Sequence, residues 1–123
     1  MAQTKTFRLG PTALSTTLTT NLCNPGTLTG GVGSYSGGSL YIILRHIRIV
    51  NKHASTAATF SLWLGATGAN AAGTELWTGK SIAANDSFEW YGNLKMTSTD
   101  FLVGGSGTAT ALTITVMSEQ IVV

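Results

Sequence analysis

The sequence contains few charged residues. Asp, Glu, Lys and Arg make up 10% of the residues, against about 25% in typical soluble domains. The net charge is +2, and the basic residues form no run. Nucleic-acid binding ordinarily needs a basic stripe that displaces counterions, so we expect no nucleic-acid partner. Such a surface favours a protein that packs against copies of itself or a larger assembly. The alternative is a small neutral domain that its hydroxyl groups keep in solution.

Cysteine and metal-ligating residues are also scarce. Cys23 is the one cysteine of the chain, which excludes an intramolecular disulfide and a cysteine-based zinc site. We expect Cys23 to be a small buried hydrophobe. His46 and His53 are the two histidines, and the first acidic residue is Glu75. A third metal ligand would have to come from a distant part of the chain, so we expect no metal and no cofactor.

Long apolar runs and catalytic motifs are missing too. The longest apolar run, Leu40–Leu44, is a fraction of a membrane span, and the first residues contain no apolar core of signal-peptide length. We therefore expect synthesis in a cytoplasm and no membrane partner. The sequence contains neither a GxSxG nucleophile elbow nor a GxxxxGK[ST] phosphate loop. The five acids show no pairing typical of glycosidases. We expect a protein that is not an enzyme.

What the sequence does contain is β-strand pattern, strongest in residues 40–65. Leu40–Val50 is rich in Ile, Leu and Tyr, which favour pleated surfaces. Ile47 and Ile49 alternate with His46 and Arg48, and a second run, TFSLWLG, follows the polar segment NKHAST. This spacing predicts an antiparallel hairpin whose apolar face packs on a partner sheet.

Short strands and turn signals alternate over the rest of the chain. Thr108–Met117 has the cleanest alternation, with Leu112, Ile114 and Val116 predicted to face inward. We expect a strand break at Gly10-Pro11, turns at Gly92-Asn93 and Gly104–Gly107, and either a bulge or a close backbone contact at Gly79. The further predicted strands are Lys5–Leu9, Thr12–Leu22, Glu75–Ile82, Ser87–Tyr91, Leu94–Thr97 and Asp100–Val103.

About eight short strands without a helix predict an all-β fold, an antiparallel β-sandwich of jelly-roll-like arrangement. The 123 residues are expected to form a single domain. In it, residues 1–39 supply N-terminal strands and a Gly-rich arm or loop, and residues 40–123 supply the core sandwich. The Gly-rich segment 24–39 is either an arm that orders on a neighbouring subunit or a surface loop with no partner.

Aromatic residues are the best candidates for contacts with other molecules. Alternation places several of them outside the core, with Trp63 the best single case because Phe60, Leu62 and Leu64 occupy the opposite face of its strand. Exposed Trp and Tyr anchor protein interfaces, and on a β-sandwich they can also stack on sugar rings. The further alternative is that both faces of the strand are covered, as in a sandwich sheet packed in an oligomer. We name as candidate interface residues Tyr41, Arg45, Arg48, Trp63 and Trp77.

Four motifs between residues 40 and 119 resemble the small β-sandwich structural proteins of tailed bacteriophages. They are the strand end Ile49-Val50-Asn51, the strand Thr59–Leu64, the IAAND turn at Ile82–Asp86 and the Thr/Ala-rich strand Ala109–Val116. In that family a V-N step leads through a Thr/Ser/Ala turn into a T-[FV]-x-L-x-[LV] strand. The family's L-x-x-G-D-x-[IL] turn departs here to LKMTSTDFL, without its glycine. Residues 1–39 have no counterpart in the resemblance.

The resemblance implies a virion structural protein without enzymatic activity. The small size of the chain and the absence of a fibrous repeat favour a capsid decoration (cement) protein that forms trimers or other homo-oligomers on the shell, with the major capsid protein or other virion proteins as partners. A component of the neck, tail or fibre is the alternative within the virion. A carbohydrate- or receptor-binding β-sandwich module is the alternative from another class. With so few charges, we expect docking to depend weakly on salt.

Overall fold

The computed structural model describes residues 3–23, 40–97 and 99–122. It is all-β: eight strands form two antiparallel four-stranded sheets, and the described residues contain no helix. The predicted β-sandwich is therefore confirmed. The strands are β1 Gln3–Ala13, β2 Asn21–Cys23, β3 Leu40–Asn51, β4 Ala58–Gly65, β5 Glu75–Ile82, β6 Ser87–Thr97, β7 Phe101–Ser106 and β8 Leu112–Val122. The Gly-rich segment 24–39 lies outside the described residues.

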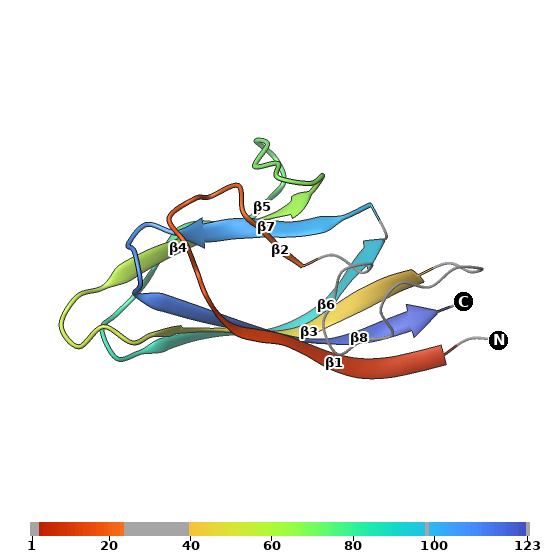
Figure 1. Cartoon of the computed structure of the whole chain (residues 1–123), viewed down its shortest axis with the longest axis horizontal. Coiled ribbons are helices and arrows are strands. Elements are labelled where there is room, and N and C mark those ends of the chain that lie inside the picture. The colour runs from red at the N-terminus through yellow and green to blue at the C-terminus, as the bar shows by residue number, and fades with distance from the viewer. Residues whose placement is uncertain (1–2, 24–39, 98, 123) are drawn as a thin grey trace.

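The two sheets stack as layers, and the chain passes repeatedly from one layer to the other (Figure 1). One sheet has the order β1-β8-β3-β6 and the other β2-β7-β4-β5. The strand pairs are nested in the sequence: β4 pairs with β5, and the flanking strands then pair outward, β3 with β6, β2 with β7 and β1 with β8. The outermost pair brings the two ends of the described chain together, with Gln3 opposite Val122.

The predicted hairpin of residues 40–65 is wrong as a pairing. β3 pairs with β6 and β8, whereas β4 pairs with β5 and β7 in the opposite sheet. The polar connection between them crosses from layer to layer, so the two apolar faces meet across the core instead of lying side by side. Burial follows the predicted alternation, because Ile47, Ile49, Phe60 and Leu62 are all buried. The alternation shows which face of a strand is buried, but it does not determine which other strand pairs with it.

Inward side chains of both sheets form one continuous core. It includes the inward residues predicted for the last strand, Leu112, Ile114 and Val116. An aromatic cluster closes the flank between the edge strands β5 and β6, where Trp77 lies 5.2 Å from Phe88 and 6.0 Å from Trp90 between ring centroids. Phe60 reaches this cluster from β4, 5.0 Å from Phe88.

Several predicted breaks and turns are strand instead. β1 continues through Gly10-Pro11 to Ala13 with a register shift between Leu9 and Thr12, which an edge strand tolerates because its outer side needs no donor. β6 runs without interruption through Gly92-Asn93. β7 includes Gly104, Gly105 and Ser106. The predicted strand 12–22 is also wrong: residues 14–20 are irregular, and strand resumes at Asn21. Of the two alternatives at Gly79, a bulge is supported by its φ of +59° and by the register shift opposite it.

Candidate interaction surface

The outer face of the β1-β8-β3-β6 sheet, the face turned away from the second sheet, carries the candidate site. We call it the outer face. Its side chains stand in rows across the strands, set by register: His46 on β3 lies opposite Met117 on β8 and Tyr91 on β6. Met117 in turn lies opposite Arg8 on β1. Directly paired residues of neighbouring strands project to the same side of a sheet, and Ile47 and Val116, which follow His46 and precede Met117, are buried on the other side.

Tyr91 forms a flat aromatic platform at one end of this row. Its ring lies over the His46 ring with 4.2 Å between centroids and 6° between planes. Tyr91 is 68% exposed, whereas the His46 side chain is 14% exposed. The imidazole Nε2 lies 3.4 Å from Oε1 of Glu89 on β6. The His46 ring therefore packs against one side of the Tyr91 ring, and the other side of the Tyr91 ring is available to a partner.

Two arginines of β3 stand beside the platform, each with a carboxylate. Arg48 Nη1 lies 3.6 Å from Glu89 Oε1. Arg45 Nη2 donates to Glu119 Oε2 at 2.9 Å, and its Nη1 donates to Asn93 Oδ1. Exposed pairs of this kind contribute at most about 1 kcal/mol to stability. Their main effect is to hold the guanidinium groups in place.

A β-bulge explains why Arg45 lies on this face next to His46. The register of β3 shifts between Leu44 and His46 in its pairing with both β6 and β8. The bulge inserts one residue, so that Leu44 and Ile47, three positions apart, are both fully buried. This change from a step of two to a step of three is the signal from which the sequence could have predicted the bulge.

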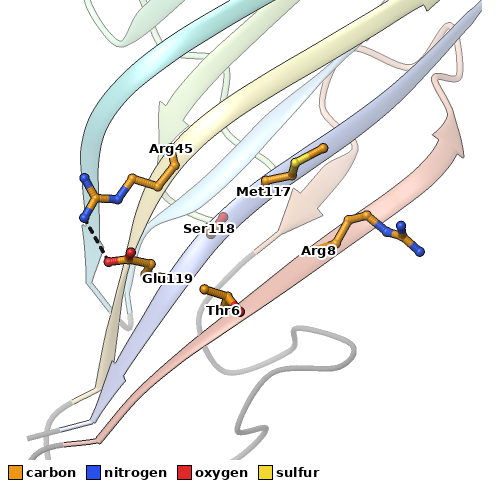
Figure 2. Close-up of a pocket in the computed structure, with 6 residues that line it drawn as sticks. All are labelled: Thr6, Arg8, Arg45, Met117, Ser118 and Glu119. Atoms are coloured by element: carbon orange, nitrogen blue, oxygen red, sulfur yellow. Dashed lines mark hydrogen bonds and ion pairs between the residues drawn. The ribbon is translucent and has the colours of Figure 1, made fainter.

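An open hollow of about 500 Å³ lies along β8, between the arginines of β1 and β3. In Figure 2, Arg45 reaches toward Glu119 on one side, while Arg8 points away on the other. Met117 stands between them and is 39% exposed. The lining residues are Thr6, Arg8, Arg45, Met117, Ser118 and Glu119. The outer face thus combines exposed apolar groups with cations and a shallow depression.

The five candidate interface residues do not lie together. Tyr41, Arg45 and Arg48 are on the outer face, and Lys95 Nζ lies 4.6 Å from the centroid of the Tyr41 ring. Trp63 lies in the other sheet and is 6% exposed, so its predicted exposure is wrong. Trp77 is partly buried in the flank cluster. Alternation alone does not predict the burial of Trp63 and Trp77, because it cannot show that both sides of a strand are covered.

Arg8 and Met117 belong to the outer face but are not among the candidates that the sequence suggests. Alternation marks Met117 as outward-facing, yet nothing in the sequence shows that residues 8 and 117 are neighbours. That contact needs the β1–β8 pairing, which joins the two ends of the chain. Long-range register is the information that the local pattern does not contain.

Cys23 lies in the core, away from the outer face. Burial raises the pKa of its thiol from 9.0 to about 12, against a smaller opposing effect of a backbone hydrogen bond with Leu102. Among the described residues, no group of three or more His, Cys, Asp or Glu is placed to hold a metal ion. In the same part of the chain, no helix is long and apolar enough to cross a bilayer.

No protein-family model matches the sequence. No curated protein matches it either.

Proposed function

We propose that this chain is a non-enzymatic structural protein of a bacteriophage virion, which docks through the outer face and acts as a capsid decoration protein. The observation that carries the proposal is the composition of that face. Exposed Tyr91, Met117, Arg45 and Arg48 stand on one sheet. Tyr, Met and Arg are the residue types that are enriched in protein interfaces over the rest of a protein surface.

The strand order supports the proposal at the level of the fold. Pairs nested as β4·β5, β3·β6, β2·β7 and β1·β8 are what rolling up one long antiparallel hairpin produces. We propose that the sandwich is a jelly roll on this ground. Jelly rolls occur in viral capsid proteins, and also in lectins and cupins. Fold alone does not name a function, and the residues of the exposed face give the more specific support.

The rigidity of the face also favours docking. β3 and β8 are central strands, each hydrogen-bonded on both sides, and the core lies directly beneath them. A preformed surface loses little conformational entropy on binding. In a decoration role, many copies would each bridge neighbouring shell subunits, alone or as trimers or other homo-oligomers. Such bridges would reinforce an expanded shell.

A carbohydrate-binding module is the second candidate, and one observation favours it. Tyr91 is flat, 68% exposed and backed by His46, the geometry on which a sugar ring can stack. Soluble glycans should then bind the wild-type chain and bind Tyr91→Ala more weakly. A glycan panel that gives no binding would count against this function.

The copy number in purified phage particles tests the main proposal. Quantitative mass spectrometry against the major capsid protein should find hundreds of copies per particle if the protein decorates the shell. A dozen or fewer would place it in the neck, tail or fibre instead. Complete absence from the particles would refute the virion role.

A further inference from the structure

The few charges of this chain are unevenly placed. Four of its seven cations, Arg8, Arg45, Arg48 and Lys95, stand on the outer face. Of its five acids, two are there, Glu89 and Glu119. The outer face therefore has an excess of two positive charges, equal to the net charge of the entire protein. A single exposed sheet face thus carries the imbalance.

The two carboxylates leave cationic groups accessible. Glu119 pairs with Arg45, whose side chain is still 44% exposed, and Glu89 pairs with Arg48, which is 52% exposed. Arg8 is exposed and has no ion pair with any residue that the structure describes. A guanidinium offers five donors in a planar fork that matches a carboxylate. An incoming carboxylate can thus bind at Arg8 without breaking an existing ion pair.

We propose that the outer face binds an acidic protein surface, with Tyr91 and Met117 as apolar anchors and the arginines pairing with carboxylates of the partner. Positive and negative patches that meet in this way steer association and fix orientation. The proposal deepens the proposed function, on which it rests for the idea that the partner is another virion protein. It adds the chemistry of the partner's surface and the residues that recognise it.

Charge argues against the two other occupants of this face. A second copy bound face to face would place two cationic surfaces together, because a twofold interface uses the same patch twice. A nucleic-acid partner is ordinarily bound by a continuous basic stripe, whereas on this face two carboxylates, Glu89 and Glu119, lie among four cations. The exposed Tyr and Met have the character of protein-interface anchors.

The test measures binding of the full chain to immobilised polymers of defined charge. The acidic probe is a random copolymer of Glu and Tyr; a Lys–Tyr copolymer and a 20-base-pair DNA duplex are the comparators. We expect binding to the Glu–Tyr copolymer and at least tenfold weaker binding to the Lys–Tyr copolymer. The DNA duplex should bind no more tightly than the Glu–Tyr copolymer. Equal binding to both copolymers, or none to the acidic one, would overturn the proposal. Tighter binding to DNA would replace it with a nucleic-acid partner.

Charge-reversal variants locate the binding to the outer face. Arg8→Glu should weaken binding to the acidic copolymer about tenfold, since it changes charge there without breaking an ion pair. Lys80→Glu on β5 of the other sheet makes the same change in charge and should alter binding less than twofold. Tyr91→Ala should also weaken binding about tenfold, with an unchanged circular dichroism spectrum. If Arg8→Glu and Lys80→Glu weaken binding equally, the effect is one of net charge and the outer face is not the site.

The two proposals can fail separately. Hundreds of copies per particle together with full incorporation of Arg8→Glu and Tyr91→Ala would leave the virion role standing and refute the outer face as the docking surface. Binding to the acidic copolymer without any copies in particles would support the outer face as a docking surface and refute the virion role.

Discussion

Asn51 is the residue that joins the two sheets at one end of the sandwich. Its side chain is fully buried, and its Nδ2 donates to the carbonyl oxygens of Thr56 and Ile82, each at 3.0 Å. Its Oδ1 accepts from the backbone N–H of His53 at 2.9 Å. Asn51 ends β3 and Ile82 ends β5, so one amide links strands of opposite sheets. In the sequence, this asparagine looks like an ordinary turn residue.

Replacement of Asn51 by alanine should therefore be costly. The change leaves the buried carbonyl oxygen of Ile82 without its partner, and it also removes the part-buried hydrogen bonds to Thr56 and His53. A buried polar group that water cannot reach costs about 1–3 kcal/mol when it loses its partner. We expect a loss of about 2–4 kcal/mol in the free energy of unfolding, measured by urea denaturation. Asn21→Ala is the control, because Asn21 makes similar bonds to Thr67 and Gly68 at an exposed site and should cost below about 1 kcal/mol. Equal losses for both variants would contradict the role of Asn51.

Cys23 makes the stability of the protein depend on pH in the alkaline range. Burial raises the pKa of its thiol to about 12 in the folded state, whereas the unfolded chain ionises near the ordinary value of 9.0. Between these values the unfolded state binds fewer protons, so stability is complete below about pH 9 and falls as pH rises toward 12. The slope contributed by this one group approaches about 1.4 kcal/mol per pH unit.

Comparison with Cys23→Ala isolates that slope. Tyrosines and lysines titrate in both proteins, so we expect the difference in free energy of unfolding between wild type and variant to be constant below pH 9 and to shrink above it. Denaturant titrations at several pH values provide the measurement. A difference that stays constant up to pH 11 would show that the thiol is accessible to water in the folded state.

At the scale of the strand, β7 shows where a local pattern misleads. The sequence GGSG predicts a flexible turn, yet Gly104 lies in β7 between β2 and β4. A Cβ at this position would lie 2.1 Å from the carbonyl oxygen of Ser61 and 2.8 Å from Cδ2 of Leu62. Glycine is there because neighbouring backbone comes too close for a side chain. That requirement comes from the opposite strand and leaves no trace in the segment itself.

Gly104→Ala should consequently destabilise the protein by about 3 kcal/mol, since a backbone oxygen cannot move aside without disturbing β4. Gly65 at the end of β4 is the matched control: a methyl group added there would have Thr74 as its nearest neighbour, at 3.9 Å, and the φ of Gly65 is not positive. Gly65→Ala should be neutral or stabilise by up to about 1 kcal/mol. Thermal and urea denaturation of both variants check this, and similar losses in both would contradict the close approach at Gly104.

Elements were predicted well where alternation decides them. β5 has the predicted bounds, and the inward residues of β3, β4 and β8 are those expected. Pairing was not predictable in the same way, because β3 and β4 show the same apolar faces whether they lie side by side or across the core. The candidate site shared this limit. Tyr41, Arg45 and Arg48 came from one strand, while Arg8 and Met117 required the register of β1 on β8.

For the whole molecule, composition and structure make opposite predictions about how strongly docking depends on salt concentration. A chain with 10% charged residues predicts docking that salt hardly affects. The fold, however, collects four of the seven cations on one exposed face, where they act on any partner surface that comes within the screening distance of about 10 Å at 0.1 M salt. The distribution of charge therefore matters more than its total.

We accordingly expect binding to the Glu–Tyr copolymer to weaken about tenfold between 50 and 300 mM NaCl, mainly through a slower association rate, because steering by exposed charges is screened first. Arg8→Glu should flatten this dependence, and Lys80→Glu should preserve it. Surface plasmon resonance at four salt concentrations gives both rates. A wild-type association rate that does not change with salt would mean that the apolar anchors Tyr91 and Met117 act alone, and that the positive excess of the outer face plays no part in recognition.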